Sequence, residues 1–367
     1  AIESTQERYT EETRGGVLSP LSSPCQDWGE AINVSAFYGR TDELARLEEW
    51  IIGDRPNHHC SVVAILGMGG IGKTALSVKL AQQIQTEFDY VIWRSLRNPR
   101  PLQEFLAGII RFLSNQQAIN VSDNTSDLIV RLIGYLQRHR CLLVLDNFET
   151  VLQSGSIQGQ YREGYEDYGQ LLQHIGEIPH QSCAIVTSRE KPLEIEALQG
   201  EILPVRILTL KGLPPTEGQQ ILISKGLPSS TNEDKQLVER YDGNPLALKI
   251  VATSILELFN GNTHNFLKQE AFVFNGIRYL LEQQFQRLSE IEVSVMFWLA
   301  INREPIFLEE LQADIVPTIS KAILLEVLTS LSRRSLIERH PTGFTQQPVV
   351  MEYVTDKLVT CICEEIR

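Results

Sequence analysis

The stretch Gly-Met-Gly-Gly-Ile-Gly-Lys-Thr at positions 67–74 has the residue types and the spacing that bind phosphate. The pattern is a glycine, four further residues, then Gly-Lys and a Ser or Thr. Glycines allow positive φ angles and let backbone N–H groups approach phosphate oxygens without a Cβ in the way. Lys73 would neutralise the β- and γ-phosphates of a nucleotide, and the Thr74 hydroxyl would ligate Mg²⁺. The residues predicted to contact the nucleotide here are Gly67, Gly69, Gly70, Gly72, Lys73, Thr74 and Ala75.

A phosphate loop needs a strand before it and a helix after it. Residues 62–66 are continuously apolar, as in a parallel strand that helices cover on both faces. Leu76, Leu80 and Ile84 recur every fourth residue, which predicts a helix whose positive N-terminal end points at the phosphates. A chance match in a glycine-rich turn would not supply both flanking elements, so phosphate binding is favoured.

Asp146 directly follows the apolar run 141–145, which is the Walker B pattern. A carboxylate at the C-terminal edge of a parallel strand can hold Mg²⁺ opposite Thr74. Many strands end in Asp, so the pattern predicts a metal ligand only because a phosphate loop lies upstream.

Other apolar runs complete an α/β pattern. They are residues 90–93, residues 183–186, and either 202–205 or 207–210. Thr-Ser-Arg follows the second of these runs, so Arg189 could either reach a γ-phosphate or lie on a solvated loop. The long segment 150–177 favours a helix with one buried face, with a partner-binding surface as the alternative.

Composition limits the class of protein. The chain has 367 residues, 43% of them hydrophobic, which is enough for two or three domains. It carries 46 acidic and 33 basic residues, and the formal net charge of −13 argues against nucleic acid as the main partner. Six scattered cysteines lack the paired spacing of a metal site and fit a reducing cytoplasm, and no run of about 18 apolar residues marks a membrane span. Since the chain begins without Met, we expect the natural N-terminus upstream.

Changes in composition along the chain predict four segments. Residues 1–36 are polar and then rich in Ser, Pro and Gly, which is typical of a linker. Residues 37–211 hold the strands and the phosphate loop. Strand signals end after this point, so residues 212–275 predict a small helical domain. Residues 276–367 predict further helices, a hairpin and a last helix.

Helices followed by a two-stranded wing indicate a winged-helix domain in the last segment. The candidate recognition helix, residues 320–331, has Lys321 as its only base before Arg333 and Arg334. A DNA-reading helix would carry more positive charge. We therefore expect this domain to act as an internal lever.

Five motifs now stand in order along the chain. They are Phe-Tyr-Gly-Arg at 37–40, the phosphate loop, Leu-Leu-Val-Leu-Asp at 142–146, Thr-Ser-Arg at 187–189 and Gly-Asn-Pro-Leu-Ala-Leu at 243–248. Together they resemble the NB-ARC group of STAND nucleotide-switch ATPases, which are relatives of plant disease-resistance proteins and of the apoptotic protease activating factor. The closest resemblance is to bacterial members that carry WD-repeat propellers. It implies an α/β P-loop NTPase domain with strand order 5-1-4-3-2, then a helical domain and a winged helix.

The resemblance also implies roles for individual residues. Arg40 and Pro245 would contact the adenine, and Arg189 the γ-phosphate. Lys73 would bind the phosphates, while Thr74 and Asp146 would hold Mg²⁺.

Two positions depart from the family pattern. Many members have a second acid directly after the Walker B Asp, but this chain has Asn147 there, and Glu149 is the candidate to orient water in its place. Members often carry a Met-His-Asp-like motif whose His senses the β-phosphate of ADP. The aligned residue here is Gln347, which can donate a hydrogen bond but cannot carry the charge of an imidazolium.

Three classes of function stay open at this point. The first is a slow ATPase switch that is closed with ADP and assembles with ATP, with Lys73, Asp146, Glu149 and Arg189 as its catalytic residues. The second is a scaffold that holds ADP without hydrolysing ATP. The third, which the net charge disfavours, is a winged-helix transcription regulator. Beyond ATP or ADP and Mg²⁺, we expect protein partners through a sensor or effector domain outside this chain, and nucleotide-dependent homo-oligomers.

Overall fold

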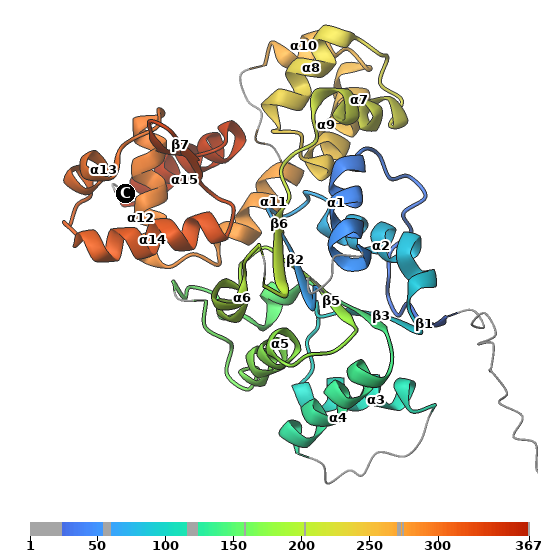
Figure 1. The fold of residues 1–367 in the computed structure, drawn as a ribbon. Coiled ribbons are helices and arrows are strands. Elements are labelled where there is room, and N and C mark those ends of the chain that lie inside the picture. Colours follow the sequence, from blue (N-terminus) through green and yellow to red (C-terminus); the bar gives the residue numbers. More distant parts are fainter. Residues whose placement is uncertain are drawn as a thin grey trace, which may run out of the picture.

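The computed structural model describes residues 24–53, 60–115, 124–157, 159–201, 203–269, 273 and 275–365. Most of the segment predicted to be a linker, residues 1–23, lies outside this part. The described residues form three units around one parallel sheet (Figure 1). They are called the sheet unit, the helical unit and the winged-helix unit below.

The sheet unit contains six parallel strands in the order β1-β3-β4-β5-β2-β6. These strands are β1 (Cys25–Asp27), β2 (Val62–Leu66), β3 (Tyr90–Ser95), β4 (Cys141–Asp146), β5 (Cys183–Ser188) and β6 (Val205–Thr209). When the phosphate-loop strand β2 is counted as strand 1, the five strands β2 to β6 lie in the order 5-1-4-3-2, read from the β6 edge. The predicted strand order is therefore confirmed. The strand predicted at either 202–205 or 207–210 is β6, which begins at the last residue of the first range and covers most of the second.

One strand was not predicted. Residues Cys25–Asp27 fall in the segment expected to be a linker, but they pair in parallel with Tyr90–Ile92 at the edge of the sheet. A three-residue strand is too short to show alternation in the sequence, and its backbone partner lies more than sixty residues away. The pairing covers an edge of the sheet that would otherwise expose unpaired N–H and C=O groups.

Helices cover both faces of the sheet (Figure 1). They are α1 (Thr41–Ile52), α2 (Lys73–Ile84), α3 (Leu102–Leu113), α4 (Thr125–Arg138), α5 (Asp167–Glu177) and α6 (Leu193–Leu198). Val63 and Ile65 of β2 pack with α1 and α2, whereas Val62, Ala64 and Leu66 pack with the core of α3, α4 and α5. Every residue of β2 is therefore buried, which explains its continuous apolar sequence.

The helical unit contains α7 (Pro215–Ser224), α8 (Thr231–Arg240), α9 (Pro245–Phe259) and α10 (Thr263–Leu267). The winged-helix unit contains α11 (Asn275–Phe285), α12 (Glu290–Asn302), α13 (Leu308–Asp314), α14 (Lys321–Arg333), β7 (Glu338–His340), β8 (Gly343–Thr345) and α15 (Pro348–Glu365). The antiparallel pair of β7 with β8 is the predicted hairpin, so helices and wing both match the expectation. The division at residues 211 and 275 stays a prediction.

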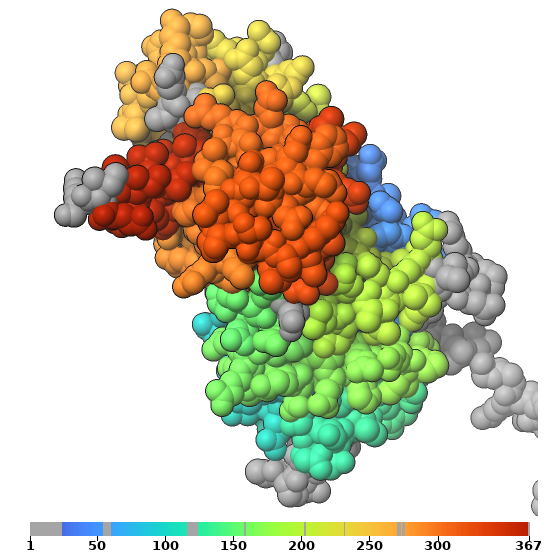
Figure 2. Space-filling view, turned by 90° about the vertical axis from the view of Figure 1, so that its left-hand side faces the viewer, coloured from blue at the N-terminus to red at the C-terminus, as the bar shows by residue number. Residues whose placement is uncertain are grey.

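The three units are packed together. Buried residues of the helical and winged-helix units form one continuous apolar cluster, and Met68 of the phosphate loop belongs to it. Figure 2 shows the winged-helix unit, in orange and red, lying against the green surface of the sheet unit. The C-terminal edge of the sheet is thus the place where all three units can meet. No helix in the described part of the chain is long and apolar enough to cross a membrane.

Candidate functional site

The phosphate loop connects β2 to α2 as the sequence predicted. Gly67, Gly70 and Gly72 have φ angles of 151°, 79° and 101°, which residues with a Cβ rarely adopt. A Cβ on Gly67 would also lie 2.8 Å from the Leu210 carbonyl oxygen. Helix α2 starts at Lys73, and its N-cap residue Gly72 provides no side-chain hydrogen bond to the first turn. Such a helix start can bind an anion.

Lys73 is buried inside this loop. Its Nζ donates to the carbonyl oxygens of Gly67 at 2.7 Å and of Met68 at 3.0 Å. Burial lowers the pKa of Lys73 to about 8, and the nearby Glu149 carboxylate partly opposes this effect. The lysine is therefore placed at the loop, with a charge that a phosphate would stabilise.

The two predicted Mg²⁺ ligands lie side by side. Thr74 Oγ1 donates to Asp146 Oδ1 at 2.8 Å, and Thr187 Oγ1 donates to the same oxygen at 2.5 Å. Burial raises the pKa of Asp146, while these two hydrogen bonds act to lower it. Neighbouring oxygen ligands of Mg²⁺ lie about 3 Å apart, so the Thr74 hydroxyl and the Asp146 carboxylate fit one ion. Among the described residues no group of three or more His, Cys, Asp or Glu could hold a metal, so the remaining ligands would be phosphate and water.

Glu149 and Arg189, both predicted to be catalytic, are paired with each other. Arg189 Nε lies 3.1 Å from Glu149 Oε1, and the Arg189 backbone N–H donates to Glu149 Oε2 at 3.2 Å. Glu149 is only 4% exposed. Asn147, which directly follows Asp146, has a φ of 63°, a left-handed conformation that Asn adopts more readily than most residues.

Arg40 lies under the phosphate loop. Its Nη2 donates to the carbonyl oxygens of Lys211 at 2.6 Å and Ile71 at 3.3 Å, and its Nη1 pairs with Glu43 at 2.7 Å. The guanidinium thus connects α1 to the phosphate loop and to the segment that follows β6. Its contact with adenine stays a prediction.

The first turn of α9 rests on the phosphate loop. Pro245, predicted to contact adenine, has its Cγ 3.9 Å from the position of a Cβ on Gly72. Asn244 was not predicted as a site residue, but its Nδ2 donates to the Gly69 carbonyl oxygen at 3.0 Å. Its Oδ1 also caps α9 by accepting two backbone N–H groups. The available signal was an Asn just before a Pro at a helix start.

A second group that the sequence did not reveal is a mostly buried set of charges between the sheet and winged-helix units, here called the Glu190 cluster. It consists of Glu190, Arg287, Glu292 and Arg334. Glu190 Oε1 lies 2.6 Å from Arg287 Nε and 2.8 Å from Arg334 Nη1. Arg334 Nε lies 3.3 Å from Glu292, which is fully buried. Arg287 Nη2 also donates to the backbone oxygen of Glu149 at 2.9 Å, so the cluster contacts the candidate active site.

Gln347 lies in the winged-helix unit, where its Nε2 donates to Glu338 at 3.3 Å. None of the hydrogen bonds found in the described residues connects it to the phosphate loop. Its neighbour Gln346 points into the core and donates to the Met296 carbonyl oxygen at 2.7 Å. The structure does not bring Gln347 together with the other predicted site residues, and its contact with ADP stays a prediction.

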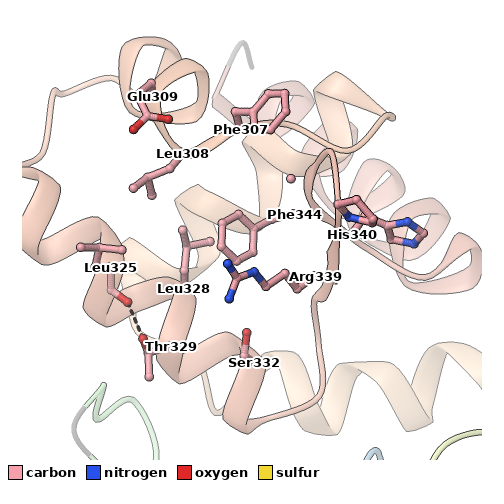
Figure 3. A pocket seen from close by; sticks show the side chains of 12 residues that line it. Phe307, Leu308, Glu309, Leu325, Leu328, Thr329, Ser332, Arg339, His340 and Phe344 are labelled. Atoms are coloured by element: carbon pink, nitrogen blue, oxygen red, sulfur yellow. Dashed lines mark hydrogen bonds between the residues drawn. The ribbon is translucent and has the colours of Figure 1, made fainter.

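A separate groove of about 490 Å³ lies between α14 and the β7–β8 hairpin (Figure 3). Leu325, Leu328 and Phe344 form its apolar part, and Thr329 and Arg339 lie at its polar part. The groove shares no residue with the phosphate loop.

Part of this chain matches a known protein family. Residues 40–157 match the model of the NB-ARC domain. An uncharacterized WD repeat-containing protein from the cyanobacterium Nostoc is 51% identical over 94% of this chain, and a disease resistance protein from Arabidopsis thaliana is 22% identical over 78%. This chain spans only 28% and 33% of those two relatives.

A solved structure shows the same fold. The Walker-type ATPase of Pyrococcus abyssi matches 86% of this chain and 95% of its own length, with a TM-score of 0.57 and 15% sequence identity. The Walker residues of this chain, Lys73, Thr74 and Asp146, occupy one site at the end of the sheet. Residues 40–157 therefore form an NB-ARC domain, and the chain has the fold of a P-loop ATPase.

Proposed function

We propose that this chain is a nucleotide-dependent switch of the NB-ARC/STAND type, which binds ATP or ADP with Mg²⁺ at residues 67–74. The packing of three units around the phosphate loop carries this proposal. Asn244 of the helical unit donates to Gly69, and Arg287 of the winged-helix unit donates to the backbone of Glu149. A nucleotide at this loop would contact or adjoin all three units. It can therefore bias their arrangement through differential affinity.

The Arg189–Glu149 pair supports a difference between ATP and ADP. A γ-phosphate that attracts Arg189 competes with the Glu149 carboxylate. The backbone oxygen of Glu149 in turn accepts a hydrogen bond from Arg287 of the Glu190 cluster. Exchange of ADP for ATP would thus change the contact between the sheet and winged-helix units. Mg²⁺ held by Thr74 and Asp146 would supply charge neutralisation at the phosphates.

The direct test of the site is Lys73→Ala, measured by calorimetric titration with ATP and ADP. Charge-assisted contacts of this kind are worth about 1.5–3 kcal/mol, so affinity should fall at least about tenfold. Lys79→Ala on the same helix is the matched control and should bind as the parent does. Equal affinities in the folded Lys73→Ala variant and the parent would remove residues 67–74 from the proposal.

A non-hydrolysing ADP scaffold is the second candidate, because Glu149 is engaged by Arg189 and the residue after Asp146 is an Asn. In a slow ATPase, Glu149→Gln should abolish phosphate release while ATP still binds, because the amide cannot accept a proton from water. The measurement is phosphate release with Mg²⁺ over long incubation. A parent without turnover decides for the scaffold, and equal turnover in both proteins excludes Glu149 as the base.

A further inference from the structure

Gln284 near the end of α11 is buried at the phosphate loop with an unpaired donor. The residue is 5% exposed, and among the described residues its Nε2 has no hydrogen-bond partner. A Cβ built on Gly69 would lie only 2.7 Å from this nitrogen. The same point lies 3.3 Å from the guanidinium carbon of Arg189 and 3.3 Å from Leu280 Cδ1. Gln284 thus reaches the loop from the winged-helix unit.

An unpaired buried amide is costly, because it loses its hydrogen bonds to water and gains none in return. The cost is offset if an acceptor joins the site. The charges nearest the amide favour an anionic acceptor, since Arg189 is beside it and the Arg189 charge acts on Lys73. Phosphate oxygens are such acceptors, and the loop at Gly69 is built to hold them.

We propose that Gln284 is a nucleotide-binding residue whose Nε2 donates a hydrogen bond to the γ-phosphate of ATP. This inference rests on the proposed function of residues 67–74 and adds a contact from α11, which none of the sequence motifs assigns. Gln284 and Arg189 meet at the same point of the loop, and Arg189 is the residue expected at the γ-phosphate. Through Gln284 the winged-helix unit contacts the group that distinguishes ATP from ADP.

The test is Gln284→Met, which keeps the length of the side chain and removes the donor. Titrations use a non-hydrolysable ATP analogue and ADP, each with Mg²⁺. We expect affinity for the analogue to fall about tenfold and affinity for ADP to fall by less than about threefold. Gln286→Met, at an exposed turn position directly after the same helix, is the matched control and should change neither affinity. Gln284→Glu should weaken the analogue further, because a carboxylate repels the phosphate.

A readout without nucleotide separates binding from folding. Removing an unsatisfied buried donor should leave the melting temperature of the nucleotide-free Gln284→Met variant equal to or above that of the parent. An analogue affinity unchanged by Gln284→Met, or an equal loss for both nucleotides, would overturn the inference while leaving the loop as a nucleotide site. A parent that binds neither nucleotide would overturn the proposed function and this inference together.

Discussion

At the scale of single residues, charge and burial at the phosphate loop act against each other. Lys73 is needed as a cation for phosphate, yet it is 8% exposed and held by two backbone carbonyl groups. Burial disfavours its charged form, and the carboxylates of Glu149 and Asp146 only partly compensate. A bound phosphate would place negative charge beside the lysine and raise its pKa again. Binding and protonation are therefore coupled at this residue.

This coupling predicts a pH dependence of nucleotide affinity. In the free chain Lys73 loses its proton as the pH rises through about 8, whereas in the complex it keeps the proton. Affinity should therefore be nearly constant just below this pH and fall by up to about tenfold per pH unit above it. Calorimetric titration with ADP at several pH values between about 7 and 10 measures the effect. Lys73→Met should bind weakly with a flat profile, and a flat profile in the parent would contradict the coupling.

At the scale of elements, the Glu190 cluster connects the segment after β5 to α12 and to the segments that follow α11 and α14. Glu190 follows directly after Arg189, so the segment after β5 carries both the predicted γ-phosphate contact and the contact with the winged-helix unit. Both side chains of the Glu190–Arg334 pair are 6% exposed. A buried ion pair gives little net stability, but removing one partner leaves an uncompensated charge.

Arg334→Met should therefore destabilise the chain by about 3 kcal/mol, since Glu292 and Glu190 lose a buried cation. The free energy of unfolding from denaturant titration gives the magnitude. Arg278→Met is the matched control, because Arg278 pairs with Asp356 at the surface and both side chains are nearly half exposed. Its effect should lie within about 1 kcal/mol of zero. Similar effects of both substitutions would show that the cluster does not hold the units together.

At the scale of the whole molecule, one ligand would contact segments that lie far apart in the chain. Gly69, Asn244 and Gln284 span more than two hundred residues and meet at one loop. A ligand that binds only this assembled arrangement stabilises it by mass action, by about 2.7 kcal/mol at a concentration about a hundred times its Kd. Nucleotide binding then stabilises one arrangement of the three units, because the ligand itself contacts residues from each of them.

ADP should accordingly raise the melting temperature and slow proteolysis at the junctions near Leu210 and Gly276. A non-hydrolysable ATP analogue should protect these junctions to a different degree, because only the triphosphate reaches Arg189 and Gln284. Limited proteolysis followed by mass spectrometry identifies the cleavage sites, and Lys73→Ala serves as the control that should show no protection. If ADP leaves the cleavage pattern of the nucleotide-free chain unchanged, nucleotide does not gate the helical and winged-helix units.

Much of the fold and part of the site could be predicted from the sequence. The strand β2, the phosphate loop and Asp146 were predicted because a buried parallel strand and a phosphate-binding loop each require particular residues at neighbouring positions. The order of the five strands came instead from the resemblance to a known family. All these features depend on patterns among residues close together in the sequence or on motifs shared with a known family.

Only the tertiary structure placed the remaining residues. Gln284, Glu190 and Arg334 carry no motif, because a buried amide or ion pair is defined by partners that come from other elements. The same reason explains why Arg189 and Glu149, each predicted to be catalytic, could not be predicted to pair with each other. Periodicity in the sequence shows which face of a helix is buried, but not what the buried polar groups on that face will contact. The amino-acid sequence thus determined a phosphate site on a parallel sheet, and tertiary packing decided which distant side chains surround it.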